Sequence, residues 1–154
     1  MKILLIVFWI SGCLIIYSTV IYFFLLKLFK QNHYKRNDQY LPSISIIICA
    51  YNEEKSIASK LQNTWELDYP LEKMQIIVAD DGSTDKTVEI ANGFDFVEIL
   101  KLPRAGKTSA QNEAVKIAEN DILVFSDANN IYKVDALKKL VRNFSDKRVG
   151  VVCG

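Results

Sequence analysis

The sequence predicts an α/β domain with a mostly parallel sheet, preceded by one transmembrane helix. Between residue 43 and residue 154, short β-branched runs alternate with amphipathic segments four times, which is the pattern of strand–helix–strand units. Ahead of them, residues 3–26 contain no Asp, Glu, Lys, Arg or His. A helix of that length reaches about 36 Å, which exceeds a bilayer core of about 30 Å.

The apolar run predicts a membrane anchor over residues 1–30, followed by a polar juxtamembrane linker over 31–42. Only Lys2 precedes the run, and the basic residues of this region follow it: Lys27, Lys30, Lys35 and Arg36. The positive-inside rule therefore places the rest of the chain in the cytoplasm. The alternative is a cleaved signal peptide. Its apolar core is usually about 7–15 residues and ends at a small-x-small site, which the exit Phe23–Lys27 lacks.

The first strand and helix of the domain are predicted over residues 44–65. Ile44–Ala50 is a β-branched run of the kind found in buried parallel strands. Asn52–Glu54 is expected to open a helix, since acidic residues favour its positive end. Ile57, Leu61 and Trp65 follow at a spacing of four, which gives that helix one apolar face.

A second strand is predicted over residues 75–79 and a third over 97–100. The turn Asp80–Asp85 separates them and supplies capping residues for a short helix that ends near Asn92. For Ser83 and Asp85 we expect this turn and capping role.

The remaining elements continue the alternation. A helix of small residues is predicted over 107–119 and a fourth strand over 122–125. Another helix carries a stripe of apolar residues at Val134, Leu137, Val141 and Phe144. Residues 149–152 are predicted to begin a fifth strand.

Polar clusters follow three of these strands, at Tyr51–Glu53, Asp80–Asp81 and Asp127–Asn129. Parallel sheets bind ligands beyond the carboxyl ends of their strands. The sequence therefore predicts one binding site where these three clusters meet.

The adjacent carboxylates of Asp80 and Asp81 are expected to point to opposite faces, so that one meets a ligand while the other braces the turn. A carboxylate there can accept hydrogen bonds from a uracil N–H or a ribose hydroxyl. We expect Asp81 to bind ligand; turn chemistry alone is the alternative.

Asp127 and Asn129 offer oxygen ligands for Mg²⁺ or Mn²⁺, which would neutralise a diphosphate leaving group. Asn129 brings no charge, so we expect weaker binding of the metal, or binding mainly by Asp127. A plain Asx-turn is the alternative.

Several other chemistries lack their residues. A phosphate-binding loop at Gly106–Thr108 fails because Lys101 stands where the motif needs glycine, although Lys107 at a helix start can still meet a phosphate. The only histidine is His33, and no cysteine pair has metal-ligand spacing. The net charge of +1 gives no reason to expect a nucleic-acid partner.

Taken together, these motifs resemble the family 2 glycosyltransferases, which have the Rossmann-like GT-A fold. The matching pieces occur in family order: Ser45–Glu54, Ile76–Asp85, Gly106–Lys107 with Asn112, and Phe125–Asn129. The resemblance implies that Tyr51 and Asp81 hold uracil, that Glu53 lies near the nucleoside, that Lys107 lies near the base or phosphates, and that Asp127 contacts metal and ribose. The nucleotide-sugar-binding residues it implies are Ala50, Tyr51, Glu53, Asp80, Asp81, Lys107 and Asp127, with metal at Asp127 and Asn129.

The resemblance further implies a membrane-bound enzyme of polysaccharide or cell-wall synthesis. It would transfer sugar with inversion from a cytoplasmic UDP-sugar to a glycan or lipid-linked acceptor. Residues 43–154 are expected to be its donor-binding part, incomplete at the carboxyl end, with the general base beyond Gly154 and the fragment alone inactive. Two alternatives stay open: a non-catalytic membrane-anchored nucleotide-binding module, and a nucleotidyltransferase. The second usually has a glycine- and arginine-rich loop where this chain has Ala50–Glu53.

Overall fold

The computed structural model describes residues 2–28 and 34–154 of the chain. It divides into two compact units, Met1–His33 and Tyr34–Gly154. Residues 1 and 29–33 lie outside the described residues, and with them lie Lys30, His33, both ends of the predicted anchor and the start of the predicted linker.

The amino-terminal unit is helical throughout its described residues. Helix α1 (Lys2–Ile16) continues through a π-helical turn η1 (Tyr17–Ile21) into α2 (Tyr22–Leu28). The stretch Lys2–Leu26 is long and apolar enough to cross a membrane, and none of its most apolar window is buried within the structure. Length and composition make it a candidate span, and a signal sequence near the amino terminus meets the same test.

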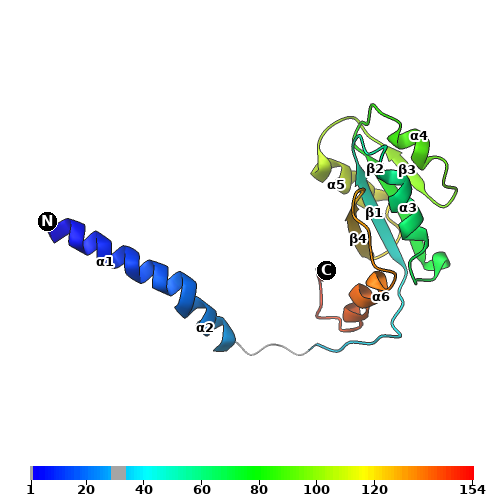
Figure 1. Ribbon diagram of the computed structural model, residues 1–154. Coiled ribbons are helices and arrows are strands. Elements are labelled where there is room, and N and C mark those ends of the chain that lie inside the picture. Colours follow the sequence, from blue (N-terminus) through cyan, green and yellow to red (C-terminus); the bar gives the residue numbers. More distant parts are fainter. Residues whose placement is uncertain (1, 29–33) are drawn as a thin grey trace. The chain divides into compact units, whose positions relative to one another are not determined.

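The second unit is built on a parallel sheet of four strands in the order β3-β2-β1-β4 (Figure 1). The strands are β1 (Ile44–Ala50), β2 (Met74–Asp80), β3 (Glu98–Lys101) and β4 (Ile122–Asp127). Each lies within two residues of its predicted bounds. For β1 and β2 this agreement follows from their composition. Their β-branched residues are buried on both sides of the sheet, as in other parallel strands.

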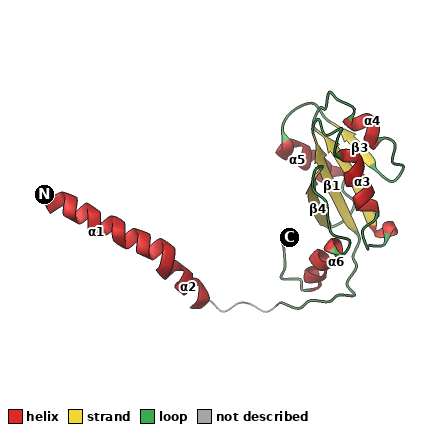
Figure 2. Ribbon diagram, in the orientation of Figure 1, coloured by secondary structure: helices red, strands yellow, loops and turns green. Residues whose placement is uncertain are grey.

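Helices cover both faces of this sheet (Figure 2). On one face lie α3 (Ile57–Trp65), α4 (Thr87–Ala91) and α6 (Ala136–Val141). On the other lies α5 (Lys107–Ile117), whose small residues Ala110 and Ala114 are buried against β1 and β2. Two short 3₁₀ turns complete the unit, η2 (Leu71–Lys73) and η3 (Arg142–Ser145). The result is a sheet between two helical layers, as the alternating pattern predicted.

Four local predictions are wrong. Val134 was expected on the apolar stripe of the last helix, but α6 begins at Ala136 and Val134 is 59% exposed. The first helix begins at Ile57 and not at Asn52, because the polar groups before it bond to a neighbouring loop. Its third stripe residue, Trp65, is 42% exposed and stacks on Phe96 with ring centroids 4.4 Å apart. Residues 149–152 form no strand, since they join no ladder of the sheet within 34–154.

The described part of the predicted linker, 34–42, is attached to the folded unit. The Lys35 amide donates to the Asp146 carboxylate at 3.1 Å, and the Asn37 amide donates to the Arg142 carbonyl at 3.2 Å. Leu41 packs against the larger core cluster. Contacts with residues near 142–146 therefore attach this segment to the folded unit. Its polar composition alone did not indicate this attachment.

Candidate functional site

The parallel register brings three strand exits to one edge of the sheet. Ala50 at the end of β1 stands beside Asp80 of β2, and Cys49 stands beside Asp127 of β4. The polar residues that come after these strands are therefore neighbours in space, as the sequence predicted.

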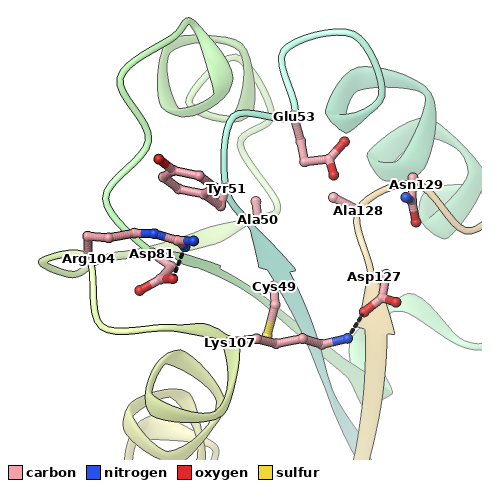
Figure 3. Close-up of a pocket in the computed structure, with 10 residues that line it drawn as sticks. All are labelled: Cys49, Ala50, Tyr51, Glu53, Asp81, Arg104, Lys107, Asp127, Ala128 and Asn129. Carbon is pink, nitrogen blue, oxygen red and sulfur yellow. Dashed lines mark hydrogen bonds and ion pairs between the residues drawn. The ribbon is translucent and has the colours of Figure 1, made fainter.

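An open pocket of about 290 Å³ lies at this edge (Figure 3). Its lining comes from the three strand exits and from the start of α5. The lining residues are Cys49, Ala50, Tyr51, Glu53, Asp81, Arg104, Lys107, Asp127, Ala128 and Asn129. Every predicted site residue except Asp80 is among them.

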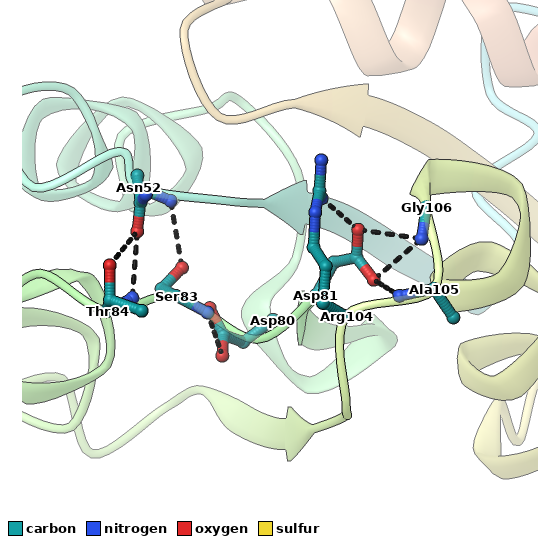
Figure 4. A network of polar contacts seen from close by, with 8 residues as sticks. All are labelled: Asn52, Asp80, Asp81, Ser83, Thr84, Arg104, Ala105 and Gly106. Atoms are coloured by element: carbon teal, nitrogen blue, oxygen red, sulfur yellow. Dashed lines mark hydrogen bonds and ion pairs between the residues drawn. The ribbon is translucent and has the colours of Figure 1, made fainter.

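Asp81 is held by the loop that leads into α5 (Figure 4). Its carboxylate accepts hydrogen bonds from the Ala105 and Gly106 amides at 2.8 and 3.0 Å, and it pairs with the Arg104 guanidinium. The Ala105 amide is the largest cause that lowers the carboxyl pKa of Asp81, against an opposing effect of burial, and Gly106 and Arg104 lower it further. Asp81 is therefore an anion in the folded protein near neutral pH.

Arg104 also reaches the aromatic ring of the pocket. Its guanidinium carbon lies 3.4 Å from the centroid of the Tyr51 ring, within the range of a cation–π contact. One side chain thus joins the Tyr51 ring to the Asp81 carboxylate, the two groups implied to hold the base.

Asp80 turns away from the pocket into its own turn. Its carboxylate accepts a hydrogen bond from the Ser83 amide at 3.1 Å, and its residue is 3% exposed. The two adjacent carboxylates do diverge as expected, with Asp81 at the pocket and Asp80 bracing the turn.

Asn52 joins the loop after β1 to the loop after β2 (Figure 4). It has a positive φ of 53°, a conformation that Asn adopts more readily than most residues. Its amide donates to the Ser83 hydroxyl at 2.9 Å, and its side-chain oxygen accepts from the Thr84 amide at 2.8 Å. This bridge fixes the backbone next to Tyr51.

Asp85 and Thr87 continue the same bridge toward the start of α4. Asp85 accepts from the Thr87 amide at 2.9 Å and from the Glu54 amide at 3.1 Å, and the Thr87 hydroxyl accepts from the Glu53 amide at 2.7 Å. Asp85 thus accepts from the first amide of α4, as a capping residue would, whereas the Ser83 hydroxyl lies in the turn and accepts from the Asn52 amide. The Glu53 carboxylate accepts from the Ser56 hydroxyl while still lining the pocket.

The opposite wall of the pocket carries an ion pair between Lys107 and Asp127. The hydrogen bond to Asp127 is the main cause that raises the pKa of Lys107. Cys49, near the end of β1, lies beside Asp127 of β4, and burial raises the pKa of its thiol against the opposing charge of Lys107. The thiol is therefore protonated near neutral pH, which makes it a weak nucleophile.

The donor atoms near Asp127 fit a divalent ion that is shared with a ligand. Asp127 and Asn129 both line the pocket, and the Asp127 side chain is 46% exposed. Within the described ranges, no group of three His, Cys, Asp or Glu side chains is placed to hold a metal ion. Such a two-residue set matches Mg²⁺ or Mn²⁺ sites in which phosphate oxygens and water complete the coordination.

Sequence reasoning did not select Arg104, Cys49 or Ala128 as site residues. Arg104 had a usable signal, since it is a basic residue two positions before the glycine that opens α5. Its ring contact with Tyr51 depends on how the loop folds back toward Gly82, where a Cβ would lie 2.8 Å from the Arg104 amide nitrogen. That close approach has no local pattern in the sequence.

Comparison with known proteins gives a consistent result. Residues 45–154 match the model of the family described as glycosyl transferase family 2. The poly-β-1,6-N-acetyl-D-glucosamine synthase of Staphylococcus aureus is 32% identical over 158 residues, which cover 96% of this chain and 36% of that protein. The chain spans about a third of the length of the curated relatives it matches.

Two solved structures share the fold. One is a mannosyltransferase of Pyrobaculum calidifontis in complex with GDP-mannose and Mn²⁺, with a TM-score of 0.79, 30% identity and coverage of 85% of this chain and 41% of that one. The other is S. aureus TarS residues 1–349 with UDP-GlcNAc, with a TM-score of 0.60, 28% identity and coverage of 63% and 29%. The motifs, the parallel sheet and the family match over most of the chain agree, and the protein belongs to glycosyl transferase family 2.

Proposed function

We propose that this chain is the donor-binding part of an inverting glycosyltransferase that uses a UDP-sugar at the cytoplasmic face of a membrane. Its product would be a growing glycan or a glycosylated lipid-linked acceptor of polysaccharide or cell-wall synthesis. The relatives support this class, since one is named as a polysaccharide synthase and TarS was solved with UDP-GlcNAc.

The observation that carries the proposal is the convergence of polar groups on one pocket. A ring, carboxylates and a lysine arrive from three strand exits and a helix start. A nucleoside diphosphate needs such a set: a ring for the base, an acceptor for its N–H, and cations for the phosphates.

Each residue has a place in this proposal. The Tyr51 ring and the Asp81 carboxylate would hold the base, with Ala50 and Glu53 beside the nucleoside. Arg104 now occupies the space between ring and carboxylate, so base binding would exchange its contacts with Asp81 for contacts of the ligand. Lys107 would turn from Asp127 toward the phosphates.

Asp127 and Asn129 would hold Mg²⁺ or Mn²⁺ together with the diphosphate, and the metal would stabilise negative charge on the leaving group. The mannosyltransferase solved with Mn²⁺ supports this assignment. In the transfer itself, the acceptor oxygen forms a bond to the anomeric carbon and its proton goes to a general base. The bond from that carbon to the diphosphate breaks, and the diphosphate leaves with the electron pair. No residue of this chain is assigned as that base.

Binding of UDP to the full chain in detergent, measured by calorimetry with and without Mn²⁺, tests the proposal. We expect binding that Mn²⁺ strengthens, with a loss of at least about tenfold in Asp81→Ala and in Asp127→Ala, because each removes a charged contact of about 1.5–3 kcal/mol. The Mn²⁺ effect should disappear in Asp127→Ala and persist in weakened form in Asp81→Ala.

The matched control is Asp95→Ala, an exposed aspartate that lies outside the pocket. It should bind UDP as the unaltered chain does. A correctly folded chain that binds neither UDP nor GDP would contradict the proposal. Tight binding of GDP without binding of UDP would support a donor site, but it would overturn the choice of uracil as the nucleobase.

A further inference from the structure

Lys60 is a fully buried cation next to the donor pocket. It lies on α3, its residue has no exposed surface, and its Nζ has no hydrogen-bond partner among the described residues. Burying an ammonium without a hydrogen bond costs several kcal/mol by general estimates, and an apolar side chain of the same length would avoid that cost. This cost indicates that Lys60 has a role beyond simple packing.

The contacts of Lys60 lead to the segment after β4. Its Nζ lies 3.8 Å from the centroid of the Tyr132 ring, a cation–π contact in a desolvated place. On the same helix, the Asn63 side chain donates to the Tyr132 carbonyl at 2.9 Å and accepts from the Tyr132 amide at 2.8 Å. These contacts hold the segment 128–132, which begins with the pocket residues Ala128 and Asn129, against α3.

The charge of Lys60 acts on the same wall of the pocket. Burial lowers the pKa of Lys60 to about 8, and the charge of Asp127 opposes this shift. The ammonium therefore remains the main form near neutral pH, and its charge interacts with that of Asp127, which Lys107 pairs with directly. Because Asn129 brings no negative charge, the single charge of Asp127 interacts with two lysines, Lys60 and Lys107.

We propose that Lys60 is a positioning residue of the nucleotide site. It holds the Asp127–Asn129 turn on α3 through Tyr132, and it offsets the charge of Asp127 so that this wall favours a diphosphate with less help from a metal ion. The inference rests on the proposed donor site and adds to it a protein cation that performs part of the metal's electrostatic work.

The test compares a charged and an uncharged ligand, UDP and uridine, in the full chain and in Lys60→Met. Without metal, we expect Lys60→Met to weaken UDP binding by about three- to tenfold, as one unit charge near a surface site would. Uridine binding, measured by ligand-observed NMR, should not change. Saturating Mn²⁺ should restore most of the lost UDP affinity, because the metal supplies the missing charge.

The control is Lys147→Met, which removes an exposed lysine outside the pocket and changes the net charge equally. It should leave both affinities unchanged. The melting temperature of Lys60→Met should not fall, since a buried unpaired charge is replaced by an apolar chain of similar length. Lys60→Gln is the second variant and should give the same selective loss.

Equal weakening of uridine and UDP would show a packing role and overturn the proposal, as would unchanged binding of both. Failure of both Lys60 variants to fold would also overturn it, because a tuning charge is not required for folding. Absence of UDP and GDP binding in the unaltered chain is a different result, since it removes the donor site itself.

Discussion

Asp81 performs a structural task at the place where ligand recognition is proposed. Its oxygens satisfy the Ala105 and Gly106 amides and pair with Arg104. A buried carboxylate with these partners is anionic and fixed in direction, which is the state that recognition of a ligand N–H requires. The loop before α5 therefore prepares the carboxylate that a base would meet, and only the Arg104 contact has to open.

The lowered pKa of Asp81 predicts how stability depends on pH. A carboxyl whose folded pKa lies below its ordinary value of 3.8 stabilises the protein above that value. This stabilisation is lost as the pH falls through the lower folded pKa. We expect Asp81→Asn to reduce the free energy of unfolding by about 1–3 kcal/mol near neutral pH, with a difference from the unaltered chain that shrinks below about pH 4.

Urea unfolding of both chains between pH 3 and pH 7 measures this difference. Asp95→Asn is the control, because the Asp95 side chain is exposed. If the difference in free energy of unfolding between the unaltered chain and Asp81→Asn stays constant or grows as the pH falls, the Asp81 charge does not stabilise the fold.

At the scale of elements, strand β1 organises the molecule. Its residues Ile46 and Ile48 face the cluster covered by α3, α4 and α6, while Ile47 faces the cluster covered by α5. Each buried isoleucine contributes roughly 1.5–3 kcal/mol. The same strand pairs with β2 and β4, so the packing of one central strand also aligns the three exits that form the pocket.

The sequence predicted the parts of the fold that have a local pattern. The strands and α5 were predicted because β-branched runs and stripes of small residues can be recognised from residues that are close together in the sequence. The start of α3 was missed because Asn52 and Glu54 bond to residues more than thirty positions away. The strand expected at 149–152 depends on a partner strand, and no run of residues in the sequence reports whether one is present.

The residues of the candidate site also fall into those that the sequence predicted and those that it did not. Its motif residues were found because they come directly after strands, which places them at one edge by register alone. Arg104 and Lys60 were missed, since the contact of the first depends on a folded loop and that of the second on a buried neighbour, Tyr132. Neither contact has a sequence spacing that identifies it.

Gly82 is the position where the loop before α5 comes nearest to the turn after β2. It has a φ of +74°, and an added Cβ would lie 2.8 Å from the Arg104 amide nitrogen and 3.2 Å from its Cα. We expect Gly82→Ala to lower the free energy of unfolding by about 2–4 kcal/mol, since backbone strain and a backbone contact add. UDP affinity should fall as well, because the Arg104–Gly106 loop that holds Asp81 must move.

Gly150→Ala provides the control for this prediction. Gly150 has no positive φ and no atom within 4 Å of an added Cβ. Gly150→Ala should therefore change the free energy of unfolding of the protein by less than about 0.5 kcal/mol. Thermal unfolding monitored by circular dichroism compares the three chains. Equal stability of Gly82→Ala and Gly150→Ala would mean that the loop adjusts without cost.

At the scale of the whole molecule, two units with different surfaces are joined in one chain. The helical unit exposes apolar side chains along its described length, while the sheet unit buries two apolar clusters between its sheet and its helices. The pocket and the family match lie in the second unit. A nucleotide-sugar is water-soluble, so under the proposed function the orientation of the first unit in a bilayer would decide which compartment supplies the donor.

The last prediction concerns that orientation and uses Cys153, an exposed thiol of the sheet unit. With Cys13 and Cys49 changed to Ser, Cys153 becomes the single reactive site of the chain. Basic residues after the apolar run, at Lys27, Lys35 and Arg36, favour the cytoplasmic side for the sheet unit. We therefore expect a membrane-impermeant maleimide to leave the chain unlabelled in intact spheroplasts of a bacterial host and to label it after lysis.

The chain with Cys153→Ser gives the background labelling. Labelling in intact spheroplasts would place the pocket outside and remove access to cytoplasmic donors. A shortened chain that leaves the membrane fraction would instead identify residues 3–26 as a cleaved signal sequence, because an uncleaved helix of that length and composition stays in the bilayer.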